Sequence, residues 1–303
     1  MKLQLSKFVL LPLVLFITAC SSPSHHKSVN SRDNNTIVAL PIATAVQVDY
    51  QDEVKLLRLN QLIAEHQGEP KEKAMLLYER GLIYDRMGLS AHSRYDFTQS
   101  INTDPAFSEP YNSLGVYLLL GQSYDEAFDA FDSAIELSDL IQFSYLHRAI
   151  GLYQVKRYPL ASRDINKFYE LDKNDPYRIL WRYIIDSKID DESALLALQN
   201  EEIASGDNRY AWSLIDVISG RTSESEFFVN VTAGVKSNKE LAERLCEAYF
   251  YLGQWHKQIG HLDKAIYYFK MTTTTNIHEF IEYKYALMEL ALIQKDLQQQ
   301  LER

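Results

Sequence analysis

The chain has 303 residues, 46% of them hydrophobic, with eleven Gly and eight Pro, which excludes a disordered, collagen-like or low-complexity protein. Its formal net charge is −10. Nucleic acids and anionic lipid surfaces recruit Lys and Arg, so this acidic balance argues against both as ligands, and we expect no nucleic-acid partner.

The N-terminus has the pattern of a secretory signal. Lys2 and Lys7 accompany an apolar run, Phe8–Ile17, that is too short to cross a membrane as a stable helix. The run ends in "ITAC", where Ala19 directly precedes Cys20, and this resembles the lipobox of bacterial lipoproteins. A plain secretory signal that happens to end near a cysteine is the alternative.

The lipobox resemblance implies that residues 1–19 are removed as a signal peptide and that Cys20 is acylated. Several acyl chains on one residue anchor a protein stably. Ser21 follows, where an Asp would imply retention in the inner membrane, so the resemblance implies the outer membrane, facing the periplasm and held by lipid alone. Cys246 is the one other cysteine, which excludes an internal disulfide, and we interpret it as a buried apolar side chain.

Residues 20–49 are predicted to form a lipid-anchored flexible tether. Ser21–Asn35 is polar and aperiodic. Its neighbouring His25 and His26 supply no closed coordination shell for a metal. Ile37–Val48 is apolar, and we expect an extended piece packed onto the body of the protein or onto a second subunit.

From residue 50 onward apolar residues recur at helical spacing, and three columns of residues repeat every 34 positions. The columns are Gly81, Gly115 and Ala149; Ser93, Ala127 and Ala161; and Phe97, Phe131 and Ile165. This is the period of the tetratricopeptide (TPR) helix–turn–helix. The small residues would let two paired helices approach, and the large residue would fill the space between them. Pro105 would end the first repeat.

These columns predict an all-α fold, a TPR helical-repeat solenoid over residues 50–303, with repeats at about 74–107, 108–141 and 142–175. A further repeat at about 246–279 carries Gly253, Ala265 and Phe269. Residues 176–245 between them should form degenerate helices, two of which start at the capping-box sequences Ser223–Glu226 and Ser237–Glu240. A terminal helix over about 279–300 should cap the stack.

The sequence contains no signature of an enzyme, a metal site or a cofactor site. The motifs GxSxG, HExxH, GxGxxG and the P-loop are all absent. The spacing of His256, His261 and His278 does not put them on one helix face, so metal binding is improbable. Asp190–Glu192 could suggest calcium, but acids at a helix start are explained by capping and the helix dipole. We therefore predict a protein that is not an enzyme and holds no cofactor.

The predicted binding surface is the concave groove that helical repeats form. In the TPR register its lining is apolar and aromatic, and Arg86 and Asn112 alone suggest a grip on a free carboxylate. The groove either binds hydrophobic segments of a partner or is filled by the protein's own middle and C-terminal helices, which we favour slightly because exposed apolar patches of that size are rare. The candidate lining residues are Tyr78, Leu82, Arg86, Asn112, Val116, Leu119, Leu146 and Tyr153.

Three stretches, "AMLLYERGLIYDRMGL" (74–89), "YNSLGVYL" (111–118) and "NIHEFIEYKYALMELAL" (276–292), resemble the NlpI lipoproteins of Gram-negative bacteria. The resemblance covers most of the mature chain and is weakest in 21–48 and 189–236. It implies an all-α homodimer that acts as an adaptor, docking the PDZ-containing periplasmic protease Prc and presenting to it the peptidoglycan endopeptidase MepS. Other murein enzymes are implied as further partners.

The one covalent site that the resemblance transfers is Cys20, and it transfers no catalytic residue. Two other functions stay open from the sequence. One is an accessory lipoprotein of envelope assembly, such as an outer-membrane-protein insertion factor or a secretion pilot. The other is a hydrolase in its own right.

Overall fold

The computed structural model describes residues 40–138, 140–202, 207 and 209–302. The predicted signal peptide, the acylation site Cys20 and the first part of the predicted tether lie outside these residues. The described part is entirely helical apart from turns and extended connections. Its helices are α1 (Tyr50–Glu65), α2 (Pro70–Arg86), α3 (Ser90–Thr103), α4 (Glu109–Leu120), α5 (Tyr124–Leu137), α6 (Gln142–Gln154), α7 (Tyr158–Glu170), α8 (Pro176–Asp186), α9 (Asp191–Gln199), α10 (Ala211–Ile218), α11 (Glu224–Val231), α12 (Asn238–Gln258), α13 (Leu262–Thr274) and α14 (Ile281–Leu301).

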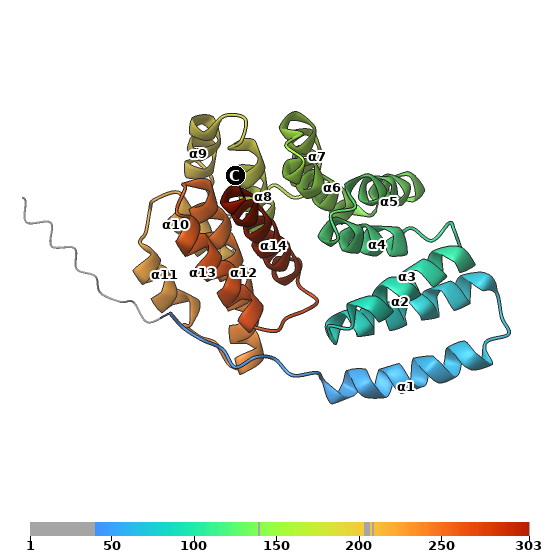
Figure 1. The fold of residues 1–303 in the computed structure, drawn as a ribbon. Helices are drawn as coiled ribbons and strands as arrows, with labels where there is room; N and C mark the ends of the chain where they lie inside the picture. The colour runs from blue at the N-terminus through green and yellow to red at the C-terminus, as the bar shows by residue number, and fades with distance from the viewer. Residues whose placement is uncertain (1–39, 139, 203–206, 208, 303) are drawn as a thin grey trace, which may run out of the picture. The chain divides into compact units, whose positions relative to one another are not determined.

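Four antiparallel helix pairs correspond to the four predicted repeats: α2/α3, α4/α5, α6/α7 and α12/α13. The first three pairs stack in chain order, since α3 contacts α4 and α5 contacts α6 (Figure 1). The fold is therefore the all-α TPR solenoid that the 34-residue period predicts. No helix in the described ranges has both the length and the apolar composition needed to cross a membrane.

The paired helices meet where the repeat columns predict. A Cβ added to Gly115 would lie 2.5 Å from Cε1 of Phe131, far inside van der Waals contact. The same holds for Gly81 against Phe97 at 2.6 Å and for Gly253 against Phe269 at 2.7 Å. In the third repeat Ala149 and Ile165 occupy these positions, and both are completely buried. The second small column, Ser93, Ala127, Ala161 and Ala265, is completely buried as well.

Helix boundaries follow the predicted signals closely. The first repeat's second helix ends at Thr103, just before Asp104–Pro105. Ser223 caps α11 in a full capping box, and Ser237 caps α12 by accepting from the Glu240 backbone. Asp190 caps α9 by accepting from Ser193, which confirms the capping interpretation of that acidic cluster. One boundary differs: α12 begins at Asn238, well before residue 246, because the Ser237 cap lengthens that helix at its start.

The end of the predicted tether is an extended strap, residues 40–48, that lies against the body. The side-chain amide of Asn238 accepts from Thr44 N and donates to Thr44 O, both at 2.8 Å. Val46 N donates to Thr275 O, and the Asn276 amide donates to Val46 O. This part of the tether is thus fixed to the ends of α12 and α13, in the way expected for its apolar sequence, and is not free.

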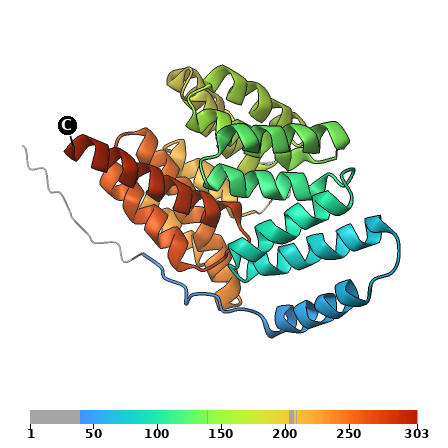
Figure 2. The same ribbon diagram turned by 45° about the vertical axis from the view of Figure 1, so that its right-hand side comes forward.

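The C-terminal helix α14 packs on α12 and α13, and it also contacts α4 of the second repeat. Figures 1 and 2 show it beside α12 and α13 in both views. Its buried side chains include Tyr285, Ala286, Met288 and Ile293. The predicted terminal helix is therefore present, and it lies where the groove of the repeats would otherwise be open.

Candidate functional site

Several of the predicted groove residues are occupied by the chain's own packing. Val116, Leu119 and Leu146 are buried in the core, with exposed fractions of 6%, 0% and 1%. Arg86, considered as a grip on a partner's carboxylate, instead donates two hydrogen bonds to Asp52 of α1, at 2.8 and 2.9 Å. Asn112 accepts from Ser144 of α6. Of these five side chains, Leu146 also lines an open pocket, and the other four are engaged by contacts within the chain.

The other three predicted residues are half-buried. The ring of Tyr78 packs against Phe97 and, edge-on, against Phe107. Leu82 lies in the middle of α2. Tyr153 packs edge-on against Tyr158, and burial together with the nearby charge of Glu289 raises its pKa well above the ordinary value. Tyr78 and Tyr153 thus belong to contacts between paired helices.

Helix α14 fills the groove by making polar contacts to successive repeats. Lys284 Nζ donates to Asp85 of the first repeat at 2.8 Å. The hydroxyl of Tyr285 and Nδ1 of His147, in the third repeat, lie 2.7 Å apart. Lys295 donates to Gln122 in the turn of the second repeat. The groove is therefore self-filled along this stretch, which is the arrangement that the sequence analysis favoured.

Glu289 is the buried centre of this contact. Its carboxylate, 0% exposed, accepts from Gln154 and Gln254 at 3.0 Å each and from Lys257 at 2.5 Å. Burial by itself would raise the pKa of Glu289, but the ion pair with Lys257 and the hydrogen bonds outweigh it and lower the pKa. The charge is thus compensated, and Glu289 joins the third repeat to α12 and α14.

The groove stays open beside the first residues of α14, as a pocket of about 280 Å³ that is also lined by α6, α7, α8 and α12. We call it the acidic pocket. Its aromatic lining consists of Phe143, Phe168, Tyr177, Trp181, Tyr251 and Phe280. Leu146, one of the predicted groove residues, also lines it. The predicted groove thus survives as this pocket at the third repeat.

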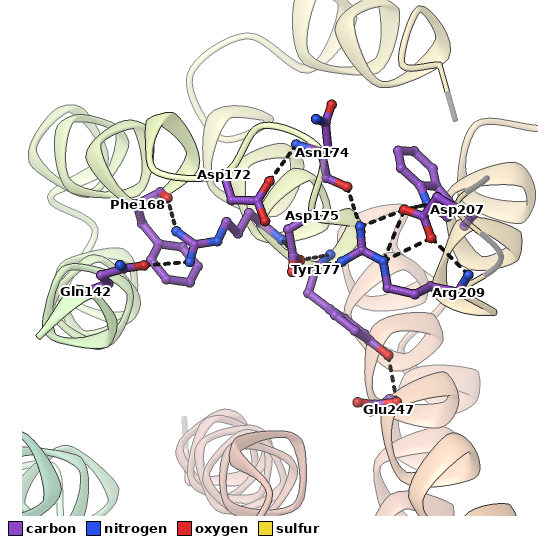
Figure 3. Close-up of polar contacts among 11 residues, drawn as sticks. Gln142, Phe168, Asp172, Asn174, Asp175, Tyr177, Asp207, Arg209 and Glu247 are labelled. Atoms are coloured by element: carbon purple, nitrogen blue, oxygen red, sulfur yellow. Dashed lines mark hydrogen bonds and ion pairs between the residues drawn. The ribbon is translucent and has the colours of Figure 1, made fainter. Parts of the chain in front are cut away.

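The acidic pocket is named for two carboxylates in its lining, Glu247 of α12 and Glu282 of α14. Glu247 accepts hydrogen bonds from the hydroxyls of Tyr177, at 2.7 Å, and Tyr210, both at Oε2 (Figure 3 shows Tyr177 directed at Glu247). Glu282, 7% exposed, accepts from the Tyr251 hydroxyl at 3.1 Å. Neither carboxylate forms an ion pair with a described residue.

Burial is the main cause of the raised pKa values of Glu247 and Glu282. It raises the pKa of Glu247 to about 8, with the charge of Glu282 as the next cause. It also raises the pKa of Glu282 to about 6. Because two uncompensated carboxylates repel each other in a medium of low polarity, the pair carries less than its full double charge at neutral pH.

A polar network holds the mouth of the acidic pocket in place (Figure 3). Asp175 caps α8 by accepting from Tyr177 N at 2.8 Å and pairs with Arg209 at 3.2 Å. Arg209 also binds Asp207 and the Asn174 carbonyl. The guanidinium of Arg178 lies 4.0 Å from the ring centroid of Phe168 and donates to Gln142 at 2.8 Å. These contacts fix the connection between α7 and α8.

Exposed apolar side chains lie close in sequence to the pocket lining. Phe143 is 54% exposed, and Leu140, three residues before it, is 84% exposed. Leu171, three residues after Phe168, is 52% exposed. An aromatic pocket with exposed apolar neighbours has the composition of a protein-binding surface more than of a solvated one.

Other candidates from the sequence have structural roles. Cys246 is completely buried, and burial raises the pKa of its thiol well above the ordinary value, as expected for an unreactive side chain. His256, 2% exposed, lies 2.9 Å from Glu224 and packs on His261. Within the described ranges no group of three or more His, Cys, Asp or Glu residues is arranged to hold a metal.

Sequence reasoning missed Glu247 and Glu282 because one lies in the last repeat and the other in the terminal helix, and the 34-residue period does not relate these two elements. The available signal is weak: each is a lone acid inside an aromatic run, "CEAYFY" and "FIEYKY". It also missed two ion pairs, Arg80–Asp96 and Arg148–Asp164. Each pair lies one position before the repeat columns, at the same spacing, which is a signal that could have been read.

Comparison with known proteins adds little beyond these observations. No protein-family model matches the chain. A chain of the APC/C hetero-tetramer Cut9–Hcn1 is 17% identical over 74% of this chain and 36% of its own length, with a TM-score of 0.47. A tetratricopeptide repeat protein from Parabacteroides merdae is 14% identical over 80% of this chain and 95% of its own, also at 0.47. YrrB, a TPR protein with an unusual peptide-binding site, is 13% identical over 71% of this chain and 90% of its own length, with a TM-score of 0.41. This chain thus spans about a third of the first of these proteins, and the fold assignment rests on the helix pairs themselves.

Proposed function

We propose that this protein is a non-catalytic scaffold for protein–protein interaction, built as a lipoprotein adaptor of the outer membrane. The observation that carries the proposal is the combination of a lipobox ending at Cys20 with a TPR solenoid that keeps one aromatic, acidic pocket open. Repeat folds offer extended surface because each unit needs only its neighbours for stability. A lipid anchor raises the effective concentration of bound partners at one membrane.

The specific role that we propose is to bring a periplasmic PDZ protease, similar to Prc, together with a peptidoglycan endopeptidase, similar to MepS, and with other murein enzymes. By controlling how fast the endopeptidase is degraded, the adaptor would regulate cell-wall hydrolysis during growth and division. The resemblance of residues 74–89, 111–118 and 276–292 to the NlpI lipoproteins supports this role. It also supports a homodimer as the working form.

Reconstitution tests the adaptor role. The protease and the endopeptidase are incubated with the adaptor, without it, or with the adaptor and a third, unrelated protease substrate. We expect the adaptor to accelerate degradation of the endopeptidase and to leave the unrelated substrate unaffected. Equal degradation rates with and without the adaptor would refute the role. Endopeptidase activity of the adaptor alone, on isolated cell wall, would instead identify a hydrolase.

The anchor is tested by a pair of cysteine variants. Cys20→Ala should leave the protein unacylated and absent from the outer-membrane fraction, whereas Cys246→Ala, which removes a buried thiol, should leave acylation and fractionation unchanged. Retention of the Cys20→Ala variant in that fraction would contradict the proposed anchor. A deletion strain separates the alternative: an assembly accessory would disturb a porin or secretin while endopeptidase levels stay constant.

A further inference from the structure

We infer that the acidic pocket receives the ammonium end of a lysine side chain carried by a partner polypeptide. The inference concerns the chemistry of one pocket and does not depend on which partner the proposed function names. It follows from the charge of the pocket, the nature of its walls, and the polar atoms that are already occupied.

The charge of the pocket is not balanced from within the protein. Glu282 is almost completely buried, and Lys284, two residues away on α14, is directed to Asp85 instead. Arg178 is the one cation among the lining residues, and its donors go to Gln142 and the Phe168 carbonyl. Buried carboxylates without a counterion are costly, so a cation that enters from outside is strongly favoured here.

The walls suit an alkyl chain that ends in a cation. Tyr177, Trp181 and Tyr251 line the pocket together with the two carboxylates, and aromatic rings attract cations as well as methylene groups. The volume of about 280 Å³ is large enough for the side chain of one lysine. A metal ion would need several more oxygen ligands than two carboxylates supply.

The occupied oxygens favour lysine over arginine. Oε2 of Glu247 already accepts from both Tyr177 and Tyr210, and Oε1 of Glu282 accepts from Tyr251. A guanidinium binds a carboxylate best through both oxygens at once, in a fork that these hydroxyls obstruct. The compact ammonium of lysine needs one oxygen from each carboxylate. Phe143, which lines the pocket and is 54% exposed, then provides an apolar contact for a residue that flanks the lysine.

Proton exchange gives the pocket a second, independent signature. The groups that face Glu247 are Tyr177, Tyr210, Glu243 and Glu282, and those that face Glu282 are Tyr251 and Lys284, with Cys246 buried nearby. Burial holds protons on the carboxylates, and an entering ammonium would stabilise their charged form and release one. Binding should therefore be accompanied by proton release at neutral pH and should weaken as the pH falls below about 6, where both carboxyls are protonated.

Calorimetry with the purified full-length protein in detergent tests the inference. The probes are an acetylated, amidated peptide with a central lysine between two leucines, the same peptide with norleucine or arginine at the centre, and free cadaverine. We expect the norleucine peptide to bind about tenfold or more weakly than the lysine peptide, because a charge-assisted hydrogen bond is lost. Arginine and cadaverine should both be weaker, and buffers of different ionisation enthalpy should reveal proton release.

The variants Glu282→Gln and Glu247→Gln keep the side-chain volume and remove the charge. Each should lower the affinity for the lysine peptide about tenfold or more. Glu247→Gln should also abolish proton release at neutral pH, because Glu247 is the carboxyl that is protonated there, whereas Glu282→Gln should only reduce it. Glu136→Gln, an exposed residue of α5, is the matched control and should change neither. Thermal melting verifies that each variant is folded. Equal binding of lysine and norleucine peptides, or unchanged binding by Glu282→Gln, would overturn the inference. Cadaverine binding as tightly as the peptide would assign the pocket to a free amine instead.

Discussion

The second and third repeats share one backbone period but join their paired helices with different side chains. The second uses Gly115 against Phe131, where even a Cβ on the glycine would clash. The third uses Ala149 and Ile165 at the same two positions, and both residues are completely buried. A larger residue on one helix accompanies a smaller one on the other, so the repeat conserves the combined volume at the crossing and not the residue types.

The adjacent pair of positions differs more strongly. In the third repeat Arg148 forms two hydrogen bonds to Asp164, at 2.6 and 2.9 Å, and the Asp164 side chain is 3% exposed. In the second repeat the equivalent residues are Leu114 and Ala130. The same backbone thus accepts either an ion pair or an apolar pair at these two positions. The two side chains must match each other in character, but the fold does not require one particular kind of pair.

The largest expected effect comes from breaking the ion pair on one side. Arg148→Leu leaves Asp164 buried without its counterion, which should lower the free energy of unfolding by about 3–5 kcal/mol. The double variant Arg148→Leu/Asp164→Ala reproduces the pair of the second repeat and should recover most of this loss. Urea denaturation measures both, and a double variant no more stable than the single one would contradict the equivalence of the two repeats.

The next test converts the Gly115–Phe131 contact of the second repeat into the Ala–Ile contact of the third. Gly115→Ala should cost about 1–3 kcal/mol, because the new Cβ meets the ring of Phe131. Adding Phe131→Ile converts the contact to the type found in the third repeat and should restore part of the stability. Additive effects of the two substitutions in chemical denaturation would show that the volumes do not compensate.

The inner face of the third repeat differs from the second in its pH dependence. His147, which corresponds to Ser113, is buried, and burial, followed by the charge of Lys284, lowers its pKa to about 3. The unfolded chain binds a proton below about pH 6.5 that the folded chain does not, so stability is complete above that pH and is lost as the pH falls toward about 3. At pH 5 this costs about 2 kcal/mol relative to pH 7.5.

The variant His147→Gln isolates that contribution, since glutamine does not titrate. Its loss of stability between pH 7.5 and pH 5 should be about 2 kcal/mol smaller than that of the unaltered protein. The measurement is urea denaturation at the two pH values. The same loss in both proteins would mean that His147 is protonated in the folded state.

The smallest effect concerns the turn between the paired helices. Lys156 adopts φ 62°, and Gly260 adopts φ 83° in the turn of the last repeat. Lys156→Gly removes the strain of a left-handed backbone and should stabilise the protein by about 0.4–1 kcal/mol, while Gly260→Ala, in open space, should destabilise it. Differential calorimetry should show melting-temperature changes of opposite sign for the two variants.

The sequence was sufficient to predict the features that repeat. The fixed period of Gly81, Gly115 and Gly253 predicted that paired helices cross closely at these positions, because a close crossing requires a small residue. The turns were harder: Gly121 is not the left-handed residue of the second repeat, since Gln122, with φ 60°, takes that conformation. Because no glycine occupies this position, the sequence does not indicate that its backbone is left-handed and strained.

The candidate site was only partly predictable. Leu146 was assigned to the groove by its repeat register, and it lines the acidic pocket together with the neighbouring Phe143. Glu247 comes from α12 of the last repeat and Glu282 from the terminal helix α14, and no periodicity indicates that these two helices bring them together. Likewise, the contact of Arg86 with Asp52 depends on where α1 packs, which repeat register does not specify.

The strap of residues 40–48 has a mechanical consequence. With the anchor proposed at Cys20, the twenty residues from Cys20 to Ala39 span at most about 70 Å, which limits how far the solenoid can stand from the membrane. A pull from the N-terminal side would first load the hydrogen bond from the Tyr249 hydroxyl to the Pro41 carbonyl. It would then load the bonds of Thr44 to Asn238 and of Val46 to Thr275 and Asn276. Tension would therefore detach the strap from the body before it acted on the helix pairs. The detachment of the extended segment would thus protect the solenoid from unfolding.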